Sequence, residues 1–176
     1  SIVAMLAIVG TEAYAGDQVP PEDVYIHVPV TYDPAVPAPL LILLHGFAVS
    51  GEVQESWMNL WPLAESRGFL YATPTGSTDS LGYPYWNAND NCCDYDGANP
   101  DHVGYLTELI NVIKTNYNVD PNRVHLVGYS NGGCMSYRMA CEKGELLASI
   151  VSVAGMTWLN PDNCPAEAPV HVLHVH

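Results

Sequence analysis

The sequence is poor in basic residues. Only 5 of its 176 residues are Lys or Arg, whereas 19 are Asp or Glu, and the formal net charge is −14. Nucleic acids and anionic membrane surfaces bind proteins through clustered cations, so neither is an expected partner of this chain. The apolar N-terminal segment, residues 1–15, is too short to span a bilayer as a helix, and we expect no membrane association.

No C-x-x-C motif occurs among the five cysteines, which disfavours a zinc ribbon or a thioredoxin-like redox site. His174 and His176 form a His-x-His, a pattern that can bind zinc, but no third ligand lies in register with them. An ordinary strand is the favoured interpretation of that segment. We therefore expect neither a metal site nor a cofactor.

Residues 1–15 end in Ala13-Tyr14-Ala15, a small-x-small pattern typical of a signal-peptide cleavage site. We interpret this segment as the remnant of a secretory signal and expect a secreted, extracellular protein. The alternative is an ordinary N-terminal strand over Ile2–Val9. In an oxidising destination disulfides are expected, and an odd number of cysteines leaves one thiol over.

The length and a hydrophobic fraction of 48% fit one globular domain with a core, without repeats or disordered tracts. We assign residues 16–176 to the N-terminal portion of a single domain.

The stretch Arg123–Cys141 carries the strongest functional signal. A short apolar run, Val124–Val127, leads into the G-x-S-x-G motif Gly128–Gly132, and residues able to form a helix follow. A strained turn between a strand and a helix pushes the hydroxyl of such a serine out above the sheet, where it can act as a nucleophile. Ser130 is therefore the predicted nucleophile. The alternative is a glycine-rich turn whose serine only caps the following helix.

Strand-like and helix-like segments alternate along the chain. Strands are predicted at Val24–Val30, as an antiparallel edge, and at Leu40–Leu44, Phe69–Ala72, Val124–Val127, Ser149–Ala154 and Val170–His176. One helix is predicted over Gln54–Arg67, with Trp57, Leu60, Trp61 and Ala64 on its buried side and Pro62 as a kink. Another begins after the capping residue Asp101 and has the core stripe Val103, Leu106, Ile110 and Ile113.

This alternation predicts an α/β fold in which a mostly parallel sheet has helices on both faces. Ligands of such sheets bind beyond the carboxyl ends of the strands. Ser130 and the tripeptide His45-Gly46-Phe47 both follow predicted strands. The long polar segment over residues 76–100 is interpreted as a binding loop.

A series of short motifs connects these elements. In order they are PLLILLHG (Pro39–Gly46), Gly68-Phe69, Pro74-Thr75-Gly76, Trp86-Asn87, Cys92-Cys93, DHVGYL (Asp101–Leu106), Val119-Asp120, Arg123-Val124, GYSNGG (Gly128–Gly133), MACE (Met139–Glu142), Val153-Ala154-Gly155 and His174-Val175-His176. The series resembles the secreted α/β-hydrolase esterases that include polyhydroxybutyrate depolymerase-like enzymes and feruloyl and acetylxylan esterases. The resemblance implies an α/β-hydrolase fold and a serine esterase acting on polyesters or on feruloyl or acetyl esters of plant cell walls.

The resemblance also implies roles for individual residues. The backbone N–H groups of Asn131 and Phe47 would form the oxyanion hole. Trp86 and Asn87 would line the acyl or polymer cleft, although a tryptophan that only anchors the loop is an equal alternative. His45 is expected to support the oxyanion loop rather than to act as a base. His102 stands where the family usually has an aspartate, which we expect to alter a helix-start interaction rather than the chemistry.

In this family the catalytic aspartate and histidine follow the position of His176, so we expect the fold to be C-terminally incomplete here. No histidine is expected to hydrogen-bond to Ser130. Cys141, on the helix that also carries Cys134, is expected to pair with Cys164 or with the loop of Cys92-Cys93. A serine peptidase of the same fold and a non-catalytic binding module remain alternatives, and the oligomeric state is not predicted.

Overall fold

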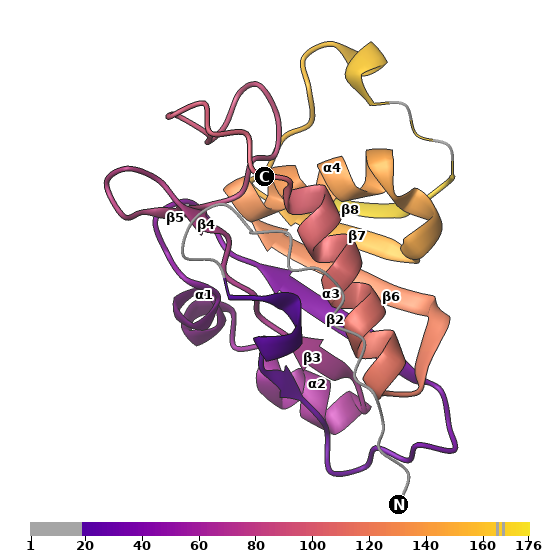
Figure 1. Cartoon of the computed structure of the whole chain (residues 1–176). Helices are drawn as coiled ribbons and strands as arrows, with labels where there is room; N and C mark the ends of the chain where they lie inside the picture. The colour runs from indigo at the N-terminus through magenta and orange to yellow at the C-terminus, as the bar shows by residue number, and fades with distance from the viewer. Residues whose placement is uncertain (1–18, 165, 167) are drawn as a thin grey trace, which may run out of the picture.

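The computed structural model describes residues 19–164, 166 and 168–176 (Figure 1). The segment interpreted as a secretory signal, residues 1–15, and the alternative strand within it lie outside these residues. In the described part, a six-stranded sheet has the strand order β1 (Ile26–His27), β3 (Leu70–Ala72), β2 (Ala38–Leu44), β6 (Val119–Tyr129), β7 (Ser149–Val153) and β8 (His171–Val175). All neighbouring strands pair in parallel except β1, which is antiparallel to β3. The predicted mostly parallel sheet is confirmed.

The strands lie close to where the sequence predicted them, except that β6 begins at Val119, five residues before the predicted start at Val124. The predicted antiparallel edge strand is confirmed as β1, although it is shorter than the interval from Val24 to Val30. At the opposite edge of the sheet, all five residues of β8 are exposed.

Strand β2 shows why the sheet has two covered faces. Leu40, Ile42 and Leu44 belong to a large core cluster, whereas Leu41 and Leu43 contact a smaller one with Ala64 and Tyr71. Successive side chains of a strand point to opposite faces, so an unbroken apolar run requires a covering layer on each side. The continuous Leu-Leu-Ile-Leu-Leu run is apolar throughout because both faces of the strand are covered.

Helices α3 (His102–Asn116) and α4 (Asn131–Glu142) cover the face with the large core. Asp101 caps α3 by accepting a 2.8 Å hydrogen bond from the backbone N–H of Gly104. The predicted core stripe is buried in full, and it consists of Val103, Leu106, Ile110 and Ile113. Both the cap and the stripe are confirmed.

The single helix predicted over Gln54–Arg67 is wrong. The structure has two helices, α1 (Gly51–Met58) and α2 (Trp61–Arg67), because Asn59 takes a left-handed conformation with φ 51° and ends α1. The Glu55 carboxylate accepts a 2.8 Å bond from the N–H of Trp61 and so caps the second helix from the first. Trp57 and Trp61 are 62% and 44% exposed, so the predicted apolar side of a continuous helix does not exist.

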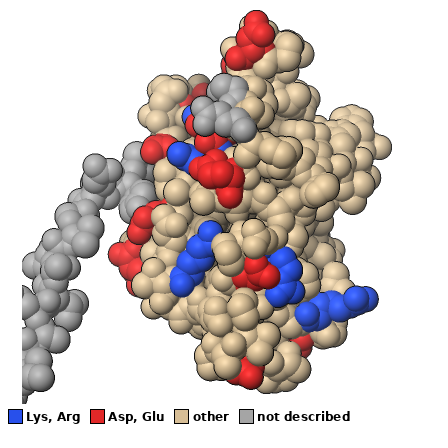
Figure 2. Space-filling view, turned by 90° about the vertical axis from the view of Figure 1, so that its right-hand side faces the viewer, with Lys and Arg blue, Asp and Glu red and all other residues tan. Residues whose placement is uncertain are grey.

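The polar segment over residues 76–100 is mostly loop, as predicted, with one small hairpin made of β4 (Ser77–Thr78) and β5 (Pro84–Tyr85). Short one-turn helices η1 (Pro21–Asp23), η2 (Gly144–Leu146) and η3 (Pro161–Asn163) complete the elements of the described chain. No helix within it is long and apolar enough to cross a membrane. On the face shown in Figure 2, the basic side chains lie among acidic and uncharged ones rather than in one continuous patch.

Candidate active site

Ser130 lies in a sharp turn between β6 and α4. Its backbone has φ 51° and ψ −114°, a region that non-glycine residues rarely occupy. Its N–H donates a 2.7 Å hydrogen bond to the carbonyl of Val153 on β7, which ties the turn to the neighbouring strand. The Ser130 side chain makes no capping bond to α4, so the alternative of a serine that only caps the helix does not describe this turn.

The glycines of the motif allow the turn to close. A Cβ atom on Gly128 would lie 2.1 Å from the carbonyl oxygen of Gly132, and one on Gly132 would lie 2.1 Å from the carbonyl oxygen of Leu44. These distances are far below van der Waals contact with backbone atoms that cannot move aside. The motif therefore requires glycine at both positions, and its second glycine lies against the end of β2.

The segment that follows β2 lies beside the serine turn. A Cβ atom on Gly46 would be 3.1 Å from the Cδ1 atom of the Tyr129 ring, so the backbone at Gly46 runs along the residue before Ser130. Gly46 N–H donates to the side chain of Gln54 at 3.0 Å, and Ala48 N–H donates to the carbonyl of Pro84 at 2.9 Å. These bonds hold the half-buried Phe47 between α1 and the hairpin.

His45 holds this segment in place through hydrogen bonds. The ring is buried, with Nδ1 donating to the Gly46 carbonyl at 2.7 Å and Nε2 accepting from the Gly76 N–H at 2.9 Å. Burial lowers the pKa of His45 to about 4, and the bond to the Gly46 carbonyl opposes that shift only in part. The ring is neutral at physiological pH, which fits the predicted supporting role.

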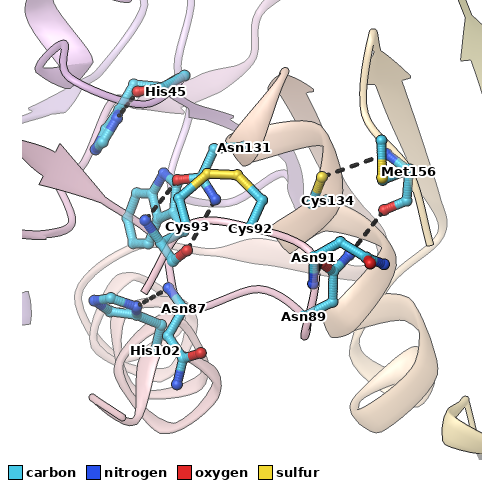
Figure 3. The surroundings of a disulfide bond; sticks show 12 residues. His45, Asn87, Asn89, Asn91, Cys92, Cys93, His102, Asn131, Cys134 and Met156 are labelled. Atoms are coloured by element: carbon cyan, nitrogen blue, oxygen red, sulfur yellow. Dashed lines mark hydrogen bonds between the residues drawn. A yellow bond between two sulfur atoms is a disulfide. The ribbon is translucent and has the colours of Figure 1, made fainter. Parts of the chain in front are cut away.

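Asn131 has a role that sequence reasoning missed. Its side chain is fully buried, accepts from the Trp86 N–H at 2.7 Å and donates to the Trp86 carbonyl at 2.8 Å (Figure 3). A carboxamide can satisfy both backbone groups of one residue in this way. The residue after the nucleophile thus holds the binding loop by its side chain.

Trp86 anchors the loop instead of facing an open cleft. Its side chain is fully buried, and its ring packs 4.9 Å from the ring of His45 and 5.2 Å from that of His102, between centroids. A ring without exposed surface has no face to offer a ligand. The structure therefore favours the loop-anchoring alternative for this side chain.

His102 connects the hairpin to the part of the binding loop that follows it. Its Nδ1 accepts from the N–H of Asn87 at 2.7 Å, and its Nε2 accepts from the N–H of Ser77 at 3.2 Å and lies 3.0 Å from the Ser77 hydroxyl. Burial, with smaller effects of His45 and Arg138, lowers the pKa of His102 to about 3. His102 was predicted to alter an interaction at the start of the helix. In the structure Asp101 caps α3, and the neutral His102 hydrogen-bonds to two loop segments.

Asn87 is half-buried and lines a cleft, and its predicted role in binding the substrate stays a prediction. Its side chain donates to the Pro100 carbonyl at 3.1 Å, and its own carbonyl accepts from Arg138 at 2.7 Å. The cleft has a volume of about 600 Å³. It is lined by loop residues between 87 and 99, by Arg138 and Glu142 of α4, and by Trp158 and Asn163.

The histidines most relevant to Ser130 hydrogen-bond elsewhere. His45 and His102 hold the loops described above, and His174 pairs with the Tyr137 hydroxyl at 3.1 Å. His27 pairs with Glu65, and His125 lies 2.8 Å from the Ser149 hydroxyl. In the part of the chain that the structure describes, no group of three or more His, Cys, Asp or Glu side chains is placed to hold a metal ion.

The predicted link between α4 and a distant cysteine is confirmed. Cys141 forms a disulfide with Cys164, with their Cα atoms 5.0 Å apart. Cys92 and Cys93 form a second disulfide with each other, which the sequence analysis did not consider (Figure 3). Cys134 remains a buried free thiol whose pKa is raised by burial.

Comparison with known proteins identifies the family. The model of the Esterase family, described as "Putative esterase", matches residues 21–171. The chain belongs to this esterase family. Its fold is shared with solved esterases, among them the acetyl xylan esterase from Aspergillus awamori, with a TM-score of 0.60 and 22% identity over 80% of this chain and 52% of that one. The α/β-hydrolase fold implied by the sequence motifs is confirmed.

Curated relatives of this esterase-family chain are longer proteins. The chain is 28% identical over 163 residues to the bifunctional acetylxylan esterase/xylanase XynS20E of Neocallimastix patriciarum, covering 93% of this chain and 22% of the relative. It is 33% identical over 128 residues to the poly(3-hydroxybutyrate) depolymerase of Ralstonia pickettii, covering 66% and 25%. It is 30% identical over 112 residues to feruloyl esterase B of Piromyces equi, covering 64% and 20%. The chain thus spans a quarter or less of each of these relatives.

Proposed function

We propose that the protein is a secreted serine esterase that cleaves carboxylic esters through an acyl-enzyme on Ser130. The observation that carries this proposal is the strained turn at Ser130, which holds a non-glycine residue at φ 51° between a parallel strand and a helix. Such strain persists only where the surrounding structure enforces it, and it concentrates at reactive sites. Membership of the esterase family supports the same conclusion.

In the proposed reaction, the Ser130 hydroxyl attacks the ester carbonyl and loses its proton to a histidine base. The negative charge that develops on the carbonyl oxygen is stabilised by the N–H groups of Asn131 and Phe47. The alcohol leaves, and water then hydrolyses the acyl-enzyme. Among the described residues, His45, His102 and His174 hydrogen-bond to groups other than Ser130, and we propose none of them as the base.

The proposed substrates are esters in polyesters or feruloyl and acetyl esters of plant cell walls. The relatives support both, since they are named as an acetylxylan esterase, a feruloyl esterase and a poly(3-hydroxybutyrate) depolymerase. Secretion is supported by the Cys141–Cys164 disulfide, which requires an oxidising compartment to persist.

Hydrolysis of 4-nitrophenyl acetate by the full-length protein tests the proposal. Ser130→Ala should lower kcat by about a thousandfold or more, as for other nucleophile knockouts. Ser66→Ala, an exposed serine on α2, is the matched control and should leave kcat unchanged. Faster turnover of a peptide anilide than of the ester would indicate a peptidase, and binding of polymer without turnover would indicate a binding module.

A further inference from the structure

Helix α1 buries a polar side chain and exposes apolar ones. Of its eight residues only Gly51 and Gln54 are buried, and Gln54 is 1% exposed. Val53 and Trp57, on the same helix, are 42% and 62% exposed. A surface helix normally turns its apolar side chains towards the core, because a buried carboxamide costs free energy unless it is hydrogen-bonded. The inverted arrangement indicates that a specific contact keeps Gln54 inside the protein.

That contact is made with the segment that follows β2. The carboxamide oxygen Oε1 of Gln54 accepts a hydrogen bond from the Gly46 N–H at 3.0 Å, and this bond is buried. A Cβ atom on Gly46 would lie 3.6 Å from the same oxygen and 3.1 Å from the ring of Tyr129. The Gly46 backbone is therefore close both to the Gln54 carboxamide and to the residue that precedes Ser130.

The start of α1 is anchored, and this sets the position of Gln54. A Cβ atom on Gly51 would lie 2.1 Å from the carbonyl oxygen of Thr73, so the helix begins directly against the backbone that follows β3. The Gly51 N–H donates to the Thr75 hydroxyl at 3.0 Å, and the Gln54 N–H donates to the Ser50 carbonyl at 2.9 Å. Gln54 thus lies in the first turn of a helix whose beginning is fixed.

Two hydrogen bonds fix the peptide groups on either side of Gly46. The Gln54 oxygen binds the N–H of the first peptide group, and His45 Nδ1 donates at 2.7 Å to the carbonyl of the second, which joins Gly46 to Phe47. This peptide is trans, so its N–H points opposite to its carbonyl, away from the His45 ring. Within the described chain the Phe47 N–H has no hydrogen-bond partner, which leaves it free for a ligand.

Both bonds are needed because the residue between them is a glycine. Glycine has the widest range of backbone conformations, and rotation at Gly46 would turn the Phe47 N–H in another direction. His45 binds only the second peptide group, whereas Gln54 binds the first. A donor that is held in the required orientation before the reaction needs no reorganisation when negative charge develops.

We propose that Gln54 is a positioning residue of the oxyanion hole. It fixes the backbone of Gly46 so that the Phe47 N–H faces the oxyanion that forms on a substrate attacked by Ser130. The inference rests on the proposed function, in which Phe47 donates to that oxyanion. It deepens that function by giving a role in the reaction to a side chain that does not itself touch the substrate.

Turnover of 4-nitrophenyl acetate by Gln54→Met and Gln54→Asn in the full-length protein tests this role. Methionine is nearly as long but has no acceptor oxygen, and asparagine is one methylene too short to reach the Gly46 N–H. Each variant should lower kcat about tenfold to a hundredfold and change KM by less than about twofold, since outright loss of one oxyanion donor costs about a hundredfold to a thousandfold in kcat. Rates are expressed per active site titrated with a fluorophosphonate, so that misfolded protein does not count.

Val53→Ala, on the exposed side of the same helix, is the matched control and should leave kcat and KM unchanged. A trifluoromethyl ketone, which forms a tetrahedral adduct with a reactive serine, gives a readout that a merely structural role would not move. Because this adduct carries the oxyanion, its inhibition constant should rise in the Gln54 variants by the factor by which kcat/KM falls.

A kcat per titrated site within about twofold of the native value in either variant, or an unchanged inhibition constant, would overturn the inference while the proposed function stands. If one variant has no titratable sites, the other decides. If the native protein hydrolyses no ester and Ser130 is not labelled, the proposed function fails, and this inference fails with it.

Discussion

The conformation of the turn at Ser130 depends on a few neighbouring residues. A serine at φ 51° costs of the order of 1 to 3 kcal/mol in backbone strain, which the packing of β6 against α4 must offset. Gly128 and Gly132 make this packing possible because neither position has room for a Cβ atom. His45 and Asn131 then hold the two segments that flank the turn.

Two of these supporting residues make stability depend on pH. The pKa values of His45 and His102 are lowered to about 4 and about 3 in the folded state, from an ordinary value near 6.5. Because each pKa is lowered in the folded state, the contribution of the neutral ring to the stability of the fold is complete above pH 6.5. It is lost as the pH falls towards 4. In that window each of these histidines lowers the free energy of unfolding by about 1.4 kcal/mol for every unit by which the pH falls, because the unfolded state binds the proton first.

We therefore predict that the free energy of unfolding, measured with urea at pH 7 and pH 4.5, falls less in His102→Gln than in the native protein. The difference should be about 2 kcal/mol, since one of the two titrating rings is removed. His171→Gln, an exposed histidine of β8, is the control and should show the native pH dependence. An unchanged pH dependence in His102→Gln would show that the His102 ring is not held neutral in the fold.

Among the elements, α4 connects three parts of the candidate site. Ser130 precedes its first residue, Asn131 binds Trp86, and Arg138 binds the Asn87 carbonyl one residue further along the loop. Near its end, Cys141 is joined to Cys164 by a disulfide. One rigid helix thus sets the relative positions of the nucleophile, the binding loop and the far side of the cleft.

The Cys141–Cys164 disulfide should contribute measurably to this arrangement. It closes a loop with a sequence separation of 23, for which chain-entropy models give about 3 kcal/mol. We predict that replacing both cysteines by alanine lowers the free energy of urea unfolding by about that amount. The Cys92→Ala/Cys93→Ala variant is the matched control, because a bridge between adjacent residues removes almost no chain entropy. A loss no larger than in this control would contradict the prediction.

At the scale of the whole molecule, regular patterns predicted most of the fold. The apolar run of β2, the capped stripe of α3 and the glycines around Ser130 each express a local requirement that the sequence shows directly. The one wrong helix came from a local side-chain contact that helical periodicity does not show, because Glu55 caps α2 beyond the break at Asn59. The choice between the two roles of Trp86 depended on contacts with two histidines remote in sequence. The position of Asn131 directly after the nucleophile was the signal in the sequence for its role.

Labelling with a fluorophosphonate probe tests the central claim, that Ser130 is an activated nucleophile, most directly. The full-length protein is incubated with the probe, and the modified residue is identified by peptide mass spectrometry. We predict one adduct, on Ser130, which is absent in Ser130→Ala, present in Ser66→Ala and lost when the native protein is denatured before labelling. An adduct on another serine that persists in Ser130→Ala would contradict the account.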